Sequence, residues 1–367
     1  MRRRLARAAF PLEVRLPGGR VESFGPGEPL LRVEASNEAG VAALCSLQEL
    51  RIVEAYMEGD IDFDGDLFAA MDLRTVLSDR QLLAKAWTFA QPALMSRKRL
   101  NPEWIAKHYD SENMQLFAID ASYQVYTPGI YVSEDDSLEE GAERKLAYAF
   151  DSLDLKPGDR LLDVGCGWGG FVRYCARRGV AATGISLSRH QLGFARDKLE
   201  AEGLEGTLLY QDFFTYEPSS RFDAISLMGS IEDLADYGKV LRRLGDWLEP
   251  GGRIYMDFAS VDRRFGVASF VTKYVWPGAF RMVYLPAFTR ALAKHHFDIV
   301  EMHNDRRNYY LWVRGGYPRW MRRKQEIVDF AGERTWRMMR ILMASTAHLM
   351  SDRSVRATAY RVVLRPR

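Results

Sequence analysis

Strand and helix patterns alternate through most of the second half of the chain. From about Leu138, apolar residues recur at helical spacing in LEEGAERKLAYAFDSL, and the short apolar run DRLLDVG follows. Further strand patterns are VAATGIS, TLLYQDF, FDAISLMG and GRIYMDFA, and the helical patterns between them are GGFVRYCARRG, SRHQLGFARDKLEAEG and GKVLRRLGDWL. This alternation predicts an α/β fold with a mostly parallel, doubly wound sheet, in which ligands bind at the carboxyl ends of the strands.

The two ends of the chain carry other patterns. Residues up to about 75 combine short strand patterns, the turns LPGGR and FGPGEP, and one helical pattern, GVAALCSLQELRIVEAYMEGD. The tail from about Tyr317 is a long helical stretch that ends in the strand-like ATAYRVVLR. A length of 367 residues fits two domains. We expect a smaller α+β domain with a linker at residues 1–95, and the larger domain at residues 96–367.

Charge and composition narrow the classes of function. The net charge is only +2, which argues against nucleic acid as a partner. Basic clusters at Arg2–Arg4, Arg97–Arg99 and Arg319–Lys324, the last containing a tryptophan, either meet anionic phospholipid head groups or are solvated faces. The three cysteines form no CxxC pair, and we find neither a signal peptide nor an apolar run long enough to span a membrane. We expect a cytoplasmic protein that contacts a membrane only peripherally, at its inner face.

The stretch LLDVGCGWGG, residues 161–170, stands where the first strand of the predicted sheet turns into a helix. Its glycines Gly165, Gly167 and Gly169 let a ligand approach the backbone closely. The glycine spacing alone is weak evidence for a dinucleotide, and ATGISLS offers no acid for a ribose after the second strand. With Asp163 in front, the pattern D-x-G-x-G-x-G resembles the first motif of S-adenosylmethionine-dependent methyltransferases.

A series of motifs in order along the chain resembles the cyclopropane-fatty-acyl-phospholipid synthases, which include mycolic acid cyclopropane synthases and related fatty-acid C-methyltransferases. The motifs are KHYDSENMQLFAID, YTPGIYVSEDDSLEE, LLDVGCGWGGF, GISLSRHQ and KYVWPG, with VEAYMEGDIDFDGDL upstream and RTWRMMRILMASTAHL downstream. The resemblance covers nearly the whole chain. It implies a Rossmann-like class I methyltransferase domain preceded by a lipid-binding-like domain, with S-adenosylmethionine as cofactor.

The resemblance also implies which residues surround the cofactor. They lie after the first three strands of the sheet and in the YTPGIY segment, and the pair after the third strand would reach the adenine. The set is Tyr126, Thr127, Asp163, Gly165, Cys166, Gly167, Trp168, Gly169, Ser186, Leu187, Gln191, Gln211 and Asp212.

The activity that the resemblance implies is methyl transfer to the double bond of an unsaturated acyl chain, usually in a membrane phospholipid. A carbocation forms on the neighbouring carbon, and loss of a proton from the added methyl group closes a cyclopropane ring. Such a site must exclude water and must place a base near the new methyl group. The expected partners are therefore phospholipid acyl chains and the membrane surface, and a homodimer is a further expectation.

The chain departs from the family at the base. The family holds a bicarbonate ion with a cysteine, a glutamate, a histidine and a tyrosine; here Glu232 and Tyr309 match, but Pro128 replaces the cysteine and Asp257 the histidine. A second carboxylate would disfavour bicarbonate. We therefore expect Glu232 or Asp257 to remove the proton directly, which would give a methyl-branched or methylene product. Alternatively, Asp257 only forms a salt bridge with an arginine.

His108, in the KHYD segment, matches a family motif near the cofactor entrance and completes the catalytic candidates. No second histidine stands at metal-ligand spacing, so we expect no metal. Two other functions stay open. One is a methyltransferase for a small soluble acceptor, since many use the same fold; the other is a lipid-binding relative without catalysis.

Overall fold

The chain divides into two compact units. The computed structural model describes Leu5 and residues 9–78, 117–234, 236–261, 269–275, 282–351 and 357–367. Unit 1 consists of Met1–Leu94, Val267–Pro277 and Tyr317–His348, and unit 2 of Met95–Gly266, Gly278–Gly316 and Leu349–Arg367. Two segments from beyond residue 95 thus cluster with unit 1. The basic clusters at Arg2–Arg4 and Arg97–Arg99 lie outside the described residues.

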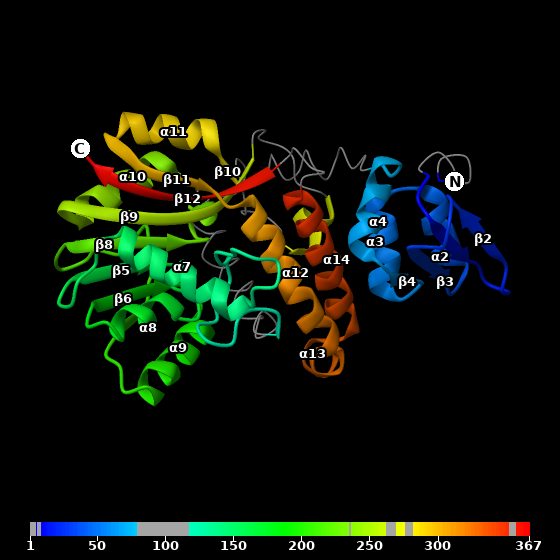
Figure 1. Ribbon diagram of the computed structural model, residues 1–367, viewed down its shortest axis with the longest axis horizontal. Coiled ribbons are helices and arrows are strands. Elements are labelled where there is room, and N and C mark those ends of the chain that lie inside the picture. Colours follow the sequence, from blue (N-terminus) through cyan, green and yellow to red (C-terminus); the bar gives the residue numbers. More distant parts are fainter. Residues whose placement is uncertain are drawn as a thin grey trace. The chain divides into compact units, whose positions relative to one another are not determined.

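Unit 2 contains an eight-stranded sheet, which confirms the predicted α/β fold (Figure 1). Its strands in spatial order are β11 (Phe297–Asn304), β12 (Ala357–Pro366), β9 (Leu248–Val261), β8 (Phe222–Met228), β5 (Arg160–Val164), β6 (Ala181–Ser186) and β7 (Thr207–Tyr210), and β10 (Val283–Tyr284) pairs with β9. The pairs from β7 to β9 are parallel, whereas β12 is antiparallel to both neighbours. Strand order reverses at β5, so its carboxyl end is the expected ligand site.

Helices cover both faces of this sheet. One face carries α7 (Leu138–Ser152), α8 (Gly170–Ala176) and α9 (Arg189–Ala201), and the other carries α10 (Tyr237–Trp247) and α11 (Leu285–Lys294) (Figure 1). Successive residues of a strand point to opposite faces. Leu161 therefore packs in the core beneath α7, α8 and α9, and Leu162 in the core beneath α10 and α11. These two cores position β5 and the turn that follows it.

Unit 1 contains a four-stranded sheet in the order β2 (Val21–Phe24), β1 (Leu12–Arg15), β3 (Leu31–Ala35) and β4 (Ile61–Gly65). Its helical elements are α2 (Glu38–Ser46), α3 (Glu49–Glu58), α4 (Leu67–Ala70), η1 (Met71–Thr75), η4 (Val271–Val275), α13 (Lys324–Ala331) and most of α14 (Glu333–Met350), and α12 (Arg306–Arg322) ends in it. The single helical pattern expected before residue 60 is two helices. Buried Leu47 adopts a left-handed φ of 50° and ends α2, because its N–H bonds back to Leu44.

The basic segment at Arg319–Lys324 contains a tryptophan that is buried and charges that are partly paired. Trp320 is fully buried, and its Nε1 donates to the Trp336 carbonyl at 3.3 Å. Arg323 pairs with Glu326 at 2.9 Å, and Lys324 pairs with Glu333 at 3.3 Å. The tryptophan is thus a core residue, and part of the positive charge is already compensated. Among the described helices, none is long and apolar enough to cross a bilayer.

Candidate functional site

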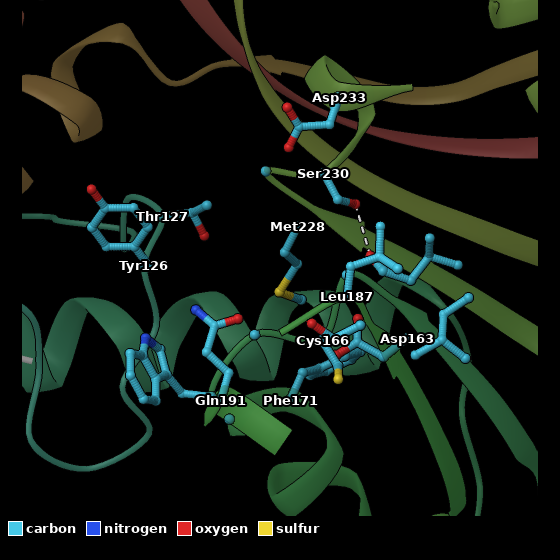
Figure 2. A pocket seen from close by; sticks show the side chains of 18 of the residues that line it. Tyr126, Thr127, Asp163, Cys166, Phe171, Leu187, Gln191, Met228, Ser230 and Asp233 are labelled. Carbon is cyan, nitrogen blue, oxygen red and sulfur yellow. Dashed lines mark hydrogen bonds between the residues drawn. The ribbon is translucent and has the colours of Figure 1, made fainter. Parts of the chain in front are cut away.

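A largely apolar cavity opens at the carboxyl ends of β5, β6, β7 and β8 (Figure 2). It is lined by the turn after β5, by residues 185–187 and 211–214, by residues 228–230, 233 and 234, and by the loop at residues 124–127. The structure brings together here all the expected cofactor residues except Gly169. Those that line the cavity are Tyr126, Thr127, Asp163, Gly165, Cys166, Gly167, Trp168, Ser186, Leu187, Gln191, Gln211 and Asp212.

The glycines after β5 serve different purposes. All three have positive φ, which side chains disfavour. A Cβ on Gly167 would meet no atom nearer than the Gly165 oxygen at 4.0 Å, so the space above Gly167 is open. A Cβ on Gly169, by contrast, would lie 2.6 Å from the Cβ of Ala195 in α9. Gly169 therefore lets two helices pack closely and does not line the cavity, unlike its expected place.

Two buried side chains that the sequence analysis missed hold the loop on the other side of the cavity. Asp120 accepts hydrogen bonds from the backbone N–H groups of Tyr123 at 2.6 Å, Gln124 at 3.1 Å and Val125 at 2.6 Å. Arg173, on α8, donates to the side-chain oxygen of Gln124 at 3.0 Å. These bonds fix the loop at residues 123–125, of which Gln124 and Val125 line the cavity.

Lys145 is a third buried residue that the sequence analysis missed. It is only 1% exposed, and its Nζ lies 2.7 Å from Oδ2 of Asp257. The same Nζ donates a hydrogen bond to the Thr127 hydroxyl. The partner that the structure shows for Asp257 is thus a lysine, whereas the sequence suggested an arginine; Arg263 and Arg264, two nearby arginines in the sequence, lie outside the described residues. Helical spacing could have revealed Lys145, because it shares the buried face of α7 with Leu138 and Ala149.

Asp163, before the glycine turn, is buried beneath the cavity. Its Oδ1 accepts a hydrogen bond from the Ser226 hydroxyl at 2.6 Å. Burial raises the pKa of Asp163 to about 6, against the lowering effects of Ser226 and Lys145. At neutral pH the group is mostly ionised, so it can accept hydrogen bonds from a ligand in the cavity.

Glu232 and Tyr309, two of the catalytic candidates, lie close together with Asp257. Oε1 of Glu232 accepts a bond from the Ala259 N–H at 2.9 Å, whereas buried Oε2 has no hydrogen-bond partner within the described part of the chain. Burial raises the pKa of Glu232 to about 8, and Asp257 adds to this. Burial also raises the pKa of Tyr309, as do the charges of Glu232 and Asp257. His108, the fourth candidate, lies outside the described residues.

Asp233 and a group of aromatic rings complete the surroundings of Glu232. Asp233 lines the cavity, and burial raises its pKa to about 7. The ring of Trp312, on α12, lies 5.8 Å from that of Tyr126 and 5.5 Å from that of Tyr309. Aromatic rings in edge-on contact thus extend from Tyr126 in the cavity wall to Tyr309 beside Glu232. The sequence analysis assigned neither Asp233 nor Trp312, since no motif marked them.

The chain is similar to lipid methyltransferases over most of its length. A family model described as Mycolic acid cyclopropane synthetase matches residues 96–359, and one described as a domain of unknown function matches residues 5–79. A sphingolipid C9-methyltransferase of Komagataella phaffii is 25% identical over 337 residues, which are 85% of this chain and 68% of that protein. A probable fatty acid methyltransferase of Pseudomonas putida is 25% identical over 360 residues, or 92% of this chain and 88% of the relative.

A solved structure shows the same fold. The structure of a cyclopropane synthase from Mycobacterium tuberculosis superposes with a TM-score of 0.66 at 20% identity, over 72% of this chain and 97% of the other. The likeness is one of fold, and it agrees with the strand order of unit 2.

Proposed function

The chain belongs to the mycolic acid cyclopropane synthetase family and is a methyltransferase, and from this premise we propose that it methylates lipid acyl chains. Relatives named as fatty acid and sphingolipid methyltransferases support this class of substrate. More specifically, the proposed acceptor is the double bond of an unsaturated acyl chain, in a membrane phospholipid. The observation that carries the proposal is the buried carboxyl of Glu232, which has one oxygen without a hydrogen-bond partner among the described residues and stands next to Asp233 in the wall of a largely apolar cavity.

The residues around the cavity fit S-adenosylmethionine. Gly167 leaves open space where a side chain would intrude, and Asp163, Gln211 and Asp212 supply oxygen atoms that can accept bonds from amine and hydroxyl groups. Tyr126 and the loop around it form another side of the cavity. When bound, the cofactor supplies an electrophilic methyl group.

The chain's own residues then protect the cation on the acyl chain from water and remove a proton from it. Water would quench such a cation, so a site of apolar and aromatic side chains favours its survival until a proton leaves. The proposed acceptor of that proton is Oε2 of Glu232, once this carboxyl is ionised. Asp257 is not the base in this proposal, because its ammonium partner, Lys145, lies 2.7 Å away. The Tyr309 hydroxyl keeps its own proton, since its pKa is raised.

Direct proton removal by Glu232, without bicarbonate, supports a methyl-branched or methylene product rather than a cyclopropane. If the carboxylate takes a proton from a chain carbon next to the cation, the product is a methyl-branched olefin. If a 1,2-hydride shift first moves the cation to the methyl-bearing carbon, loss of a methyl proton gives the methylene product. Ring closure requires loss of a methyl proton while the cation is still on the neighbouring carbon. Pro128 supplies no thiol in the loop where the family has a cysteine. The family's anion-binding set is therefore incomplete in this chain.

Lipid analysis tests the proposal. The chain is expressed in a bacterial host whose own cyclopropane synthase is deleted, and acyl chains are examined by mass spectrometry before and after mild hydrogenation. We expect acyl chains with one added CH₂, and an olefin that takes up hydrogen. Acyl chains without any added carbon would refute lipid methylation, and a ring that survives hydrogenation would refute the branched product. Glu232→Gln should abolish the product, whereas Glu217→Gln, at a side chain 75% exposed, should not.

Membrane contact and a homodimer stay predictions. Contact with anionic lipid would depend on the positive charges of the basic cluster at Arg319–Lys324, of which those of Arg323 and Lys324 are paired with glutamates. Co-sedimentation with vesicles that contain phosphatidylglycerol should therefore fall as salt increases. Binding that is independent of salt would contradict an electrostatic contact.

A further inference from the structure

Lys145 joins two parts of the site that lie far apart in the sequence. Its Nζ contacts Oδ2 of Asp257 at 2.7 Å and donates to the hydroxyl of Thr127. Thr127 lines the cavity and packs on Gly229, where a Cβ would come within 2.4 Å of the threonine methyl carbon. Asp257 is the last residue of β9 that pairs with β8, and its backbone carbonyl accepts a hydrogen bond from the Gly229 N–H at 3.0 Å.

The charge of Lys145 also acts on Asp163. Lys145 lowers the pKa of this buried carboxyl, and Asp257 raises it. Asp163 on β5 and Asp257 on β9 are thus two buried acids that share one buried cation. The neutral Ser226 hydroxyl on β8 faces Asp163, and the carboxyl of Glu232 and the phenol of Tyr309 face Asp257. Without Lys145, both carboxylates would lose this compensating charge, and a buried site tolerates uncompensated charge poorly.

We propose that Lys145 is a positioning residue, which holds the cofactor wall at Thr127 and the carboxyl of Asp257 together so that Glu232, and not Asp257, is left to accept a proton. An ammonium group has three N–H donors, so it can bind both partners at once. The inference rests on the proposed function for the role of Glu232. The contact with Thr127 is independent of that role, because it affects only the binding of S-adenosylmethionine or of S-adenosylhomocysteine.

A purely structural role for Lys145 makes a different prediction. Removing one partner of a buried ion pair destabilises a protein, whereas replacing both partners by apolar side chains of similar size often restores the stability. If Lys145 only stabilises the fold, the double replacement should also restore cofactor binding. If Lys145 positions Thr127, binding should stay weak, because the restored fold still lacks the bond to the hydroxyl.

The experiment compares Lys145→Met with the double variant Lys145→Met/Asp257→Leu. Titration calorimetry measures the affinity for S-adenosylhomocysteine, and melting temperatures measure the stability. We expect the double variant to melt near the wild type yet to bind about tenfold more weakly, the usual loss for a hydrogen bond from a charged donor. Lys145→Arg should recover part of the affinity. Lys156→Met is the matched control, at a side chain 70% exposed, and should bind like the wild type.

Two further readouts keep the proposal open to refutation if Lys145→Met does not fold. Thr127→Val should weaken binding without removing any charge. In a folded variant without Lys145, the loss of affinity on acidification should begin at a higher pH, because Asp163 then holds its proton more tightly. Wild-type affinity in the double variant or in Thr127→Val would overturn the proposal. These titrations need no lipid, so a wild-type protein that binds S-adenosylhomocysteine but methylates no acyl chain would refute the proposed function instead.

Discussion

Replacing Glu232 by glutamine should make the stability of the protein depend less on pH. The Glu232 carboxyl is buried, and burial raises its pKa from the ordinary value of 4.5 to about 8. Between these two values the unfolded chain has lost the proton, while the native protein still binds it. The native state therefore binds more protons in this window, and its stability falls as the pH rises from about 4.5 to about 8.

The size of this effect follows from the two pKa values. Their difference is about 3.5, and one pKa unit corresponds to about 1.4 kcal/mol, so the full loss is roughly 5 kcal/mol. Water that enters around the buried carboxylate reduces this figure, which makes it an upper bound. Glutamine has the same shape and no charge in this range. The variant should lack this part of the loss.

Urea unfolding at pH values of about 5 and about 8 tests this reasoning. The free energy of unfolding of the wild type should fall between the two conditions by several kcal/mol more than that of Glu232→Gln. Asp163 and Asp233 also have raised pKa values, but they contribute equally to both proteins. Glu217→Gln, at an exposed side chain, should behave like the wild type. Equal losses in the wild type and Glu232→Gln would refute the raised pKa.

Three further predictions concern the cavity and its base. Gly169→Ala should lower the free energy of unfolding by more than Gly203→Ala, which urea unfolding measures. Both glycines have positive φ, where a side chain costs roughly 1–2 kcal/mol, but only at Gly169 would the new Cβ lie 2.6 Å from a neighbouring Cβ. Gly167→Ala should weaken binding of S-adenosylhomocysteine in calorimetry, since its Cβ would enter open cavity space, and equal affinity would contradict that placement. Turnover should rise with pH toward a plateau above about 8, as Glu232 ionises. Glu232→Gln should lose this rise and should be slower by about 10²–10⁴-fold. A variant with the pH profile of the wild type would exclude Glu232 as the base.

Much of unit 2 could be predicted from the sequence, because its signals are local. The apolar runs of β5 and β6, and the amphipathic spacing of α7, depend on residues only a few positions apart. The glycines of the turn after β5 mark a close approach of the backbone for the same reason. The break at Leu47 was missed, since a left-handed leucine has no local sequence signal.

Within the site, the sequence predicted those residues at the carboxyl ends of the strands that directly follow a strand whose pattern is visible in the chain. Only the tertiary structure decided how they share charge. Lys145 and Asp257 come from separate elements and meet inside the fold, where burial makes each charge depend on the other. The same burial raises the pKa of Glu232 and leaves one of its oxygens without a partner in the described part of the chain, a difference that no spacing of residues along the chain encodes.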